Sequence, residues 1–165
     1  MTMNKNISLG KIFPPTFRLV AMPLVAVLLI SLLMSSSSHK TTIFIIGDST
    51  AAEKGNYRNY PERGWGMVFQ GCFDDQIIVD NHAVNGRSSK SFLDEGRWQK
   101  ILDKMQPGDY VIIQFGHNDE KKFPNRYTIP GGTFDAHLAK YVNETRQKGG
   151  IPVLMNSVVR RCYYS

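Results

Sequence analysis

The chain has 165 residues, of which 42% are hydrophobic and 21% charged; this balance excludes a disordered polymer, and the length suits a single domain. The net charge of +6 is concentrated at the N-terminus, because the first 40 residues contain four basic and no acidic side chains, whereas the other 125 contain 16 basic and 14 acidic ones. A body so nearly neutral excludes a generic polyanion binder, and no nucleic-acid partner is expected.

The first 40 residues have the order of a secretory signal peptide followed by a short linker. Residues 1–18 are basic, residues 19–34 are uncharged and rich in leucine and valine, and four serines follow at residues 35–38. The uncharged run of 16 residues is shorter than the roughly 20 that a membrane span needs. We therefore expect a secreted or periplasmic protein cleaved near Ser38. An uncleaved signal anchor is the alternative, and the leader is the only expected contact with a membrane.

Four short apolar runs follow in residues 41–165, which we expect to form the folded domain. They occupy residues 43–46, 110–115, 151–155 and 77–79, the last of which begins a strand expected to reach about Val84, and glycine or proline lies beside most of them. Wholly apolar runs of this length are typical of strands buried on both faces of a parallel sheet.

Helical patterns lie between these runs. Residues 98–105 and 134–145 repeat apolar side chains at the spacing of one helix face, with Thr133 as the expected N-cap of the second, and a shorter helix is expected over residues 64–73. Alternating strands and helices predict an α/β, three-layer α/β/α sandwich with a parallel sheet. Ligands of such folds bind beyond the carboxyl ends of the strands, so the loops there are the places to search.

The loop after the first strand is Gly47-Asp48-Ser49-Thr50. A serine on a tight turn between strand and helix exposes its hydroxyl, and its backbone N–H lies where negative charge is stabilised. This geometry suits a nucleophile that generates an oxyanion beside itself. The alternative is that Asp48 and Ser49 only cap the next helix.

Two further loops offer hydrogen-bond donors at the same sheet edge. The second contains Gly86, where a backbone N–H is open to a ligand, and the third contains Asn118, whose amide donates without titrating. Each loop alone could be an ordinary turn. Together with Ser49 they predict a nucleophile with an oxyanion hole of two or three donors.

These blocks resemble the SGNH (GDSL) hydrolase superfamily, through GDS at residues 47–49, the glycine Gly86 of the second loop and the G-x-N-D block at residues 116–119. The stretches NHAVNGRSSKSF, EGRW, FGHND, PGGTF and VVRR are similar to secreted rhamnogalacturonan acetylesterases, which deacetylate the pectin backbone, and the resemblance covers residues 42–161. It implies a flavodoxin-like fold with Ser49 as nucleophile and with Gly86 and Asn118 completing the oxyanion hole. Asp48 would order the serine loop.

The family's fourth block, D-x-x-H, supplies a catalytic histidine and its aspartate, and no D-x-x-H occurs in this sequence. We therefore expect a chain that is truncated at its C-terminus and nearly inactive by itself. Of the histidines, His82 lies in a strand pattern, His137 is expected on a helix surface, and His117 is expected to touch substrate rather than to activate Ser49.

The resemblance implies an acetylated acidic polysaccharide as the partner, and basic side chains near the cleft would help to bind it. Arg87 is the first candidate, and the others that follow the last strand or the third block are Lys121, Lys122, Arg126, Arg160 and Arg161. All of them could equally be solvated surface charge. The aromatic rings of Trp65 and Trp98 could stack on sugars, although the spacing of Trp98 favours the core.

No cofactor is expected, and no metal, because His82 and His117 are isolated from cysteine and acidic ligands. Cys72 and Cys162 are too few for a disulfide scaffold, and nothing in their spacing requires them to pair. Oligomeric state is not indicated.

Two rival functions stay open at this point. One is a lipase or thioesterase of the same superfamily, against which the polar loop residues Asn56, Arg58, Asn59 and Arg63 argue. The other is a non-catalytic phosphate- or carbohydrate-binding module, against which the lack of G-x-G-x-x-G and G-x-x-x-x-G-K-[ST] after any strand argues.

Overall fold

The computed structural model describes residues 39–55 and 61–159. The chain divides into two units, Met1–His39 and Lys40–Ser165, and the second contains the sheet and its helices. The expected leader, the loop residues Asn56, Arg58 and Asn59, and the C-terminal Arg160, Arg161 and Cys162 lie outside the described residues. Within the described part of the chain, no helix has the length and apolar character that crossing a membrane requires.

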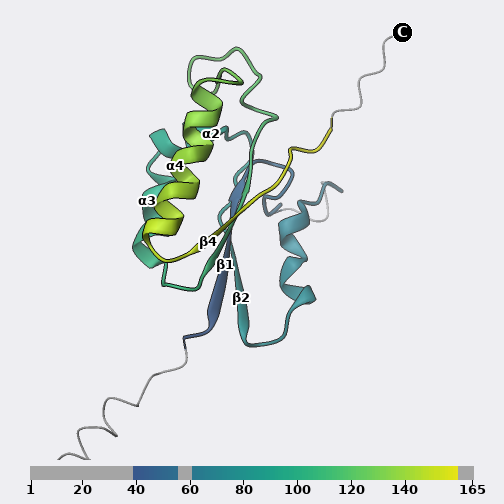
Figure 1. The fold of residues 1–165 in the computed structure, drawn as a ribbon. Helices are drawn as coiled ribbons and strands as arrows, with labels where there is room; N and C mark the ends of the chain where they lie inside the picture. Colours follow the sequence, from purple (N-terminus) through teal and green to yellow (C-terminus); the bar gives the residue numbers. More distant parts are fainter. Residues whose placement is uncertain (1–38, 56–60, 160–165) are drawn as a thin grey trace, which may run out of the picture. The chain divides into compact units, whose positions relative to one another are not determined.

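Four parallel strands form one sheet in the order β2-β1-β3-β4 (Figure 1). Their bounds are Thr41–Gly47 for β1, Ile77–Asn81 for β2, Tyr110–Gln114 for β3 and Ile151–Leu154 for β4. The predicted parallel α/β sheet is therefore confirmed, although β2 ends three residues earlier than the apolar pattern indicated. In the register of β1 and β3, Gly47 is opposite Gln114, so the loops after both strands leave from the same edge.

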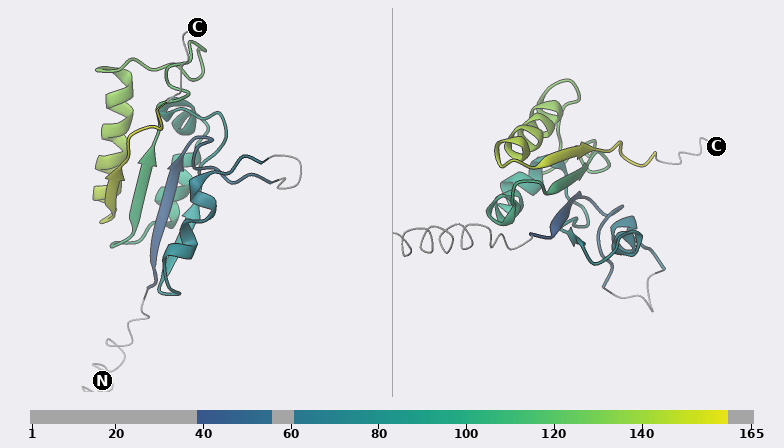
Figure 2. Two further views of the ribbon diagram at one scale, coloured as in Figure 1. Left: turned by 90° about the vertical axis from the view of Figure 1, so that its right-hand side faces the viewer. Right: turned by 60° about the horizontal axis from the view of Figure 1, so that its bottom comes forward.

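Helices cover both faces of the sheet (Figures 1 and 2). Helices α2 (Ser89–Asp94), α3 (Arg97–Lys104) and α4 (Thr133–Gln147) lie on one face. On the other face, the 3-10 helix η3 (Phe69–Cys72) contacts β2, and the 3-10 helix η2 (Trp65–Met67) contacts η3. The expected helix over residues 64–73 is thus two short 3-10 turns. Thr133 is not an N-cap, because Gly132 holds that position and the Thr133 hydroxyl accepts a hydrogen bond from the Ile129 N–H at 2.9 Å.

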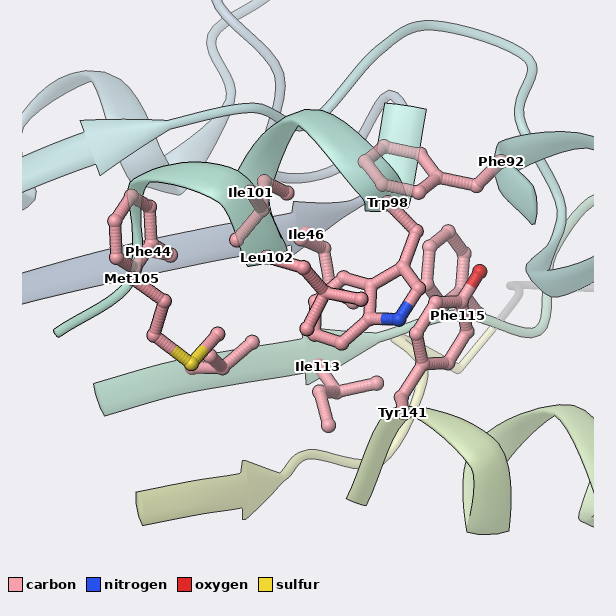
Figure 3. Packing of buried hydrophobic residues seen from close by; sticks show 11 residues of the cluster. Phe44, Ile46, Phe92, Trp98, Ile101, Leu102, Met105, Ile113, Phe115 and Tyr141 are labelled. Atoms are coloured by element: carbon pink, nitrogen blue, oxygen red, sulfur yellow. The ribbon is translucent and has the colours of Figure 1, made fainter. Parts of the chain in front are cut away.

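Each face of the sheet has its own hydrophobic core, because successive strand residues point to opposite sides. On the α2–α4 side, Phe44 and Ile46 pack with aromatic residues from the helices (Figure 3). There the ring of Tyr141 stacks on Phe115 and meets Trp98 edge-on, with centroids 5.6 and 5.0 Å apart. Trp98 is therefore a core residue, as its spacing predicted.

The opposite core is built from smaller side chains, and its buried members are Ile43, Ile45, Ala51, Ala52, Ala83 and Ile112. Strands β2 and β4 form the two margins of the sheet (Figure 2), and the apolar side chains Ile151, Val153 and Leu154 of β4 are exposed. Leu154, for example, is 55% exposed, whereas Ile113 on β3 is fully buried.

Candidate active site

The turn that follows β1 holds Ser49 and is organised by Asp48. The buried Asp48 carboxylate accepts hydrogen bonds from the Thr50 N–H at 2.9 Å and from the Thr50 hydroxyl at 2.8 Å. The Asp48 carbonyl accepts from the N–H groups of Ala51 and Ala52. These bonds close one turn and no more, so the helix expected directly after Ser49 is absent from described residues 48–55.

Gly47 must be glycine for the strand to enter this turn. A Cβ at residue 47 would lie 2.7 Å from the backbone oxygen of Gln114, which is closer than a carbon can approach. The first letter of the GDS block therefore lets β1 pack tightly against the end of β3. As a consequence, the turn that carries Ser49 begins at a fixed position relative to the end of β3.

The Gln114 side chain ties the serine turn to its surroundings. Its Oε1 accepts from the Thr50 hydroxyl at 3.1 Å and from the Trp65 indole N–H at 2.7 Å, while its Nε2 donates to the Asn156 carbonyl at 3.0 Å. The indole nitrogen of Trp65 therefore faces the protein. Sequence reasoning missed Gln114; the only signal was an amide at the end of an otherwise apolar strand.

The Ser49 hydroxyl is half-buried and makes no hydrogen bond in the described part of the chain. The described imidazoles have other contacts. His82 lies 2.9 Å from the Asp80 carboxylate, His117 contacts the Val158 carbonyl, and His137 lies 3.2 Å from the Ser89 hydroxyl. His137 lies on a helix as expected and is half-buried, with its ring against Ser89 of helix α2.

The second loop is fastened to the serine turn through the backbone. The Val84 N–H donates to the Gly47 carbonyl at 3.1 Å, and the Arg87 N–H donates back to the Val84 carbonyl at 3.2 Å. Gly86 between them has φ +77, in the left-handed region that favours glycine. The side chain of Asn85 is held by the Lys54 ammonium, 2.7 Å from Asn85 Oδ1.

Asn118 in the third loop is buried, and its amide is fixed on both sides. Its Nδ2 donates to the Arg87 carbonyl at 3.0 Å, and its Oδ1 accepts from the Lys121 ammonium at 3.0 Å. The Arg87 carbonyl uses one of the two N–H groups of the amide, which leaves the other available. The structure thus brings Asn118 against the Gly86–Arg87 segment, which in turn is bonded to the strand that precedes Ser49.

Asp119, which sequence reasoning quoted but gave no role, holds the third loop on helix α2. Its buried carboxylate accepts from the Ser89 N–H, the Ser89 hydroxyl and the Thr128 hydroxyl. Burial raises the pKa of Asp119, and these hydrogen bonds offset only part of the rise. The Tyr141 hydroxyl donates to the Ser89 carbonyl at 2.7 Å, so the same point is anchored to α4.

Arg87, the first sequence candidate for substrate binding, has partners within the protein. Its Nε lies 3.1 Å from Glu95 Oε2, and its Nη1 donates to the Asn85 carbonyl at 3.0 Å. Burial alone would raise the pKa of Glu95, but hydrogen bonds from Arg97 and Arg87 outweigh it and lower the pKa. Arg87 is therefore held in place before any substrate arrives, although it shares the single charge of Glu95 with Arg97.

His117, the second candidate, lines a pocket of about 560 Å³. The pocket lies between the third loop and the segment after β4, and neither Ser49 nor Gly86 lines it. Its other side-chain walls include Glu120, Lys122, Tyr127, Phe134 and Val158.

Metal-binding groups and paired cysteines are both absent from the described residues. Among residues 39–55 and 61–159, no three His, Cys, Asp or Glu side chains are grouped so that they could hold a metal ion. Cys72 is a free, exposed thiol. What the sheet edge holds instead is a serine turn tied through Gly47 and Val84 to the second loop, which Asn118 contacts in turn.

Comparison with known proteins identifies relatives of this arrangement. The model of the GDSL-like Lipase/Acylhydrolase family matches residues 45–164. Rhamnogalacturonan acetylesterase RhgT of Bacillus subtilis is 43% identical over 119 residues, which are 72% of this chain and 50% of RhgT. A rhamnogalacturonan acetylesterase of Emericella nidulans is 39% identical over 109 residues, 64% of this chain and 41% of the fungal protein. The chain thus spans about half the length of the curated relatives it matches.

Solved structures give a consistent result for the fold. Protein YxiM of Bacillus subtilis superposes with a TM-score of 0.59 at 26% identity, covering 72% of this chain and 33% of YxiM. The psychrotrophic esterase EstA of Pseudoalteromonas superposes with a TM-score of 0.52 at 25% identity, covering 69% of this chain and 58% of EstA.

Proposed function

The chain belongs to the GDSL-like lipase/acylhydrolase family, and on that premise we propose that it serves as a serine esterase removing acetyl groups from rhamnogalacturonan. The reaction class follows from the family. The substrate is proposed because relatives 39–43% identical to this chain are named rhamnogalacturonan acetylesterases. An acetylated acidic polysaccharide is accordingly the proposed partner.

In the proposed reaction the Ser49 oxygen attacks the acetyl carbonyl and a tetrahedral oxyanion forms. The N–H groups of Ser49 and Gly86 and the remaining N–H of Asn118 donate to this oxyanion. The intermediate collapses, the sugar alcohol leaves with a proton, and water hydrolyses the acetyl-serine to acetate. The observation on which the proposal rests is the Asn118 amide, held 3.0 Å from the Arg87 carbonyl and 3.0 Å from Lys121, with one N–H left over.

The proton of Ser49 needs an acceptor, and the proposed acceptor is the histidine of a D-x-x-H block, which these 165 residues do not contain. Loss of the histidine of a serine triad costs on the order of 10⁶ in turnover, and an oxyanion hole alone leaves about 10³–10⁴ over water. We therefore expect the polypeptide that ends at Ser165 to be nearly inactive alone.

The test compares two polypeptides. One is the 165-residue chain; the other, which we call the extended enzyme, continues the same residues through a D-x-x-H block. The block comes from the reading frame after codon 165 or, where that frame has none, from the matching part of RhgT. We expect the extended enzyme to release acetate from acetylated rhamnogalacturonan and a fluorophosphonate to label Ser49. Brisk acetate release by the 165-residue chain alone would contradict the assigned need for the block.

The same assay separates the rival functions. A lipase or thioesterase would cleave an octanoyl ester faster than an acetyl ester, whereas we expect the acetyl ester to be preferred. A non-catalytic carbohydrate-binding module would bind the polysaccharide without being labelled by the fluorophosphonate.

We also propose export, on the basis of the basic, apolar and serine-rich order of residues 1–38. Fusion of these residues to a reporter enzyme that is active only outside the cytoplasm tests it. A reporter that stays inactive would contradict export.

A further inference from the structure

The guanidinium of Arg126 lies over Gly86. A Cβ built at residue 86 would be 3.5 Å from Arg126 Nη1 and 3.6 Å from both Cζ and Nη2. Because these three distances are nearly equal, the flat face of the guanidinium is turned toward the glycine. Its N–H groups lie around the rim of that plane and point away from Gly86.

Arg126 is half-buried, and its guanidinium has no hydrogen-bond or ion-pair partner in the part of the chain that the structure describes. Its one recorded contact of another kind is with the Phe123 ring, 5.9 Å from Cζ to the centroid. A guanidinium has five N–H donors, and leaving them without acceptors in a partly dry site is costly unless a ligand or water supplies them.

Three other basic side chains of the loops around Gly86 have partners within the described residues. Arg87 pairs with Glu95, Lys54 binds Asn85, and Lys121 binds Asn118. Arg126 is therefore the cation beside the proposed oxyanion hole whose donors are open to substrate.

The backbone that carries Arg126 is also held by hydrogen bonds. Its own N–H and that of Tyr127 donate to the Phe123 carbonyl at 2.9 Å. Two residues later, the buried Thr128 bonds to Asp119 through both its N–H and its hydroxyl, at 3.0 Å each. An arginine on a held backbone segment binds an anion with less entropic cost than one on a mobile loop does.

We propose that Arg126 determines specificity by binding the carboxylate of an acidic sugar adjacent to the acetylated residue. This proposal rests on the proposed function, since it assigns the charge of the substrate to a particular side chain of the same site. A guanidinium matches a carboxylate with two parallel N–H···O bonds, which gives both strength and orientation. The proposal places Arg126 ahead of Arg87, which the sequence indicates as the first candidate for substrate binding.

The test uses a pair of substrates that differ only in charge. One is an acetylated oligosaccharide that contains galacturonate; the other is the same compound after its carboxylates are reduced to alcohols. For the extended enzyme we expect kcat/KM to favour the charged substrate by about 10- to 100-fold, the range that a charge-assisted hydrogen bond supplies. In Arg126→Gln we expect this preference to fall to nearly onefold, mostly through KM.

Three variants sharpen the test. Arg126→Lys keeps the positive charge but lacks the two parallel N–H donors of a guanidinium, so it should retain an intermediate preference for the charged substrate. Arg146→Gln removes the same charge from an exposed site near the end of α4 and should retain the full preference. Arg87→Gln should lose less of the preference than Arg126→Gln does; a larger loss in Arg87→Gln, or an unchanged preference in Arg126→Gln, overturns the proposal. Circular dichroism checks folding, and Arg126→Lys decides should Arg126→Gln unfold.

A binding measurement separates this proposal from the proposed function. If the extended enzyme releases no acetate from either substrate, the proposed function fails. Calorimetric titration with the deacetylated galacturonate oligosaccharide then tests Arg126 alone. An affinity that is about 10-fold or more lower in Arg126→Gln than in the wild type supports the proposal, and equal affinities overturn it.

Discussion

The two halves of the candidate site are held in different ways. On the oxyanion side, Asn118 is buried and both ends of its amide are engaged. On the nucleophile side, the backbone of the turn is fixed by Asp48, but the Ser49 hydroxyl has no hydrogen-bond partner among residues 39–55 and 61–159. Donors to a developing charge must be oriented in advance, because reorientation during the reaction costs energy. Stabilisation of the oxyanion and removal of the proton are therefore separable in this fold.

The largest expected effect comes from removing the Ser49 hydroxyl on the nucleophile side. In the extended enzyme we expect Ser49→Ala to lower kcat by about 10⁵–10⁶, because no acetyl-enzyme can form. Acetate release measures the loss, and fluorophosphonate labelling should disappear with it. A variant that keeps more than about one hundredth of the wild-type kcat would show that the nucleophile lies elsewhere.

The second-largest effect comes from removing the oriented donor. We expect Asn118→Ala to lower kcat by about 10²–10³ with little change in KM, since the donor acts on charge that exists only in the transition state. Steady-state kinetics with an acetyl ester measures both constants. A change confined to KM would mean that the amide binds the ground state instead.

The third prediction concerns the Asp119 carboxylate, which holds the loop of Asn118 on helix α2. Asp119→Ala leaves the Ser89 N–H, the Ser89 hydroxyl and the Thr128 hydroxyl without their buried acceptor. We expect the free energy of unfolding to fall by about 3 kcal/mol. Urea denaturation measures it, with exposed Asp103→Ala on α3 as the control, for which a change of under about 0.5 kcal/mol is expected. Equal losses in the two variants would contradict the assigned role.

The fourth loosens the amide without removing it. In Lys121→Met the Asn118 Oδ1 loses its cation, so the remaining N–H becomes both a weaker donor and a less fixed one. We expect kcat to fall by about 10-fold, a loss of the size that one charge-assisted hydrogen bond provides. Exposed Lys100→Met, on α3, is the charge-matched control. If kcat falls by the same factor in both variants, the loss comes from the change in net charge and not from the contact with Asn118.

The smallest expected effect concerns pH. Because the pKa of Asp119 is raised in the folded state, the folded protein binds a proton more tightly than the unfolded chain does. Asp119 therefore adds stability as the pH falls through the window between its folded pKa and the ordinary value near 3.8. The unfolding free energy of wild type minus that of Asp119→Asn should grow as the pH falls through this window. Urea titrations at several pH values measure it, and a difference that shrinks would contradict the raised pKa.

The sheet could be predicted from sequence because its strands are buried on both faces and so appear as short apolar runs. Helix α2 could not, since its six residues are too few for a periodic signal. The roles of Gln114 and Asp119 depend on partners 64 and 30 residues away, and local sequence does not display such contacts. Likewise, the sequence shows that Arg87 is basic but not that it pairs with Glu95. The roles given to Ser49, Gly86 and Asn118 stay predictions until the variants are measured.

The contact between Trp65 and Gln114 provides a spectroscopic reporter. The chain has two tryptophans, and Trp98 lies in the core with its indole N–H bonded to Glu144 at 2.6 Å. Replacing Trp98 with phenylalanine would leave a single indole, whose N–H shares the Gln114 oxygen with Thr50, next to Ser49 in sequence. Its emission wavelength and quenching would then follow rearrangements of this turn during inhibitor or sugar binding, without any added dye.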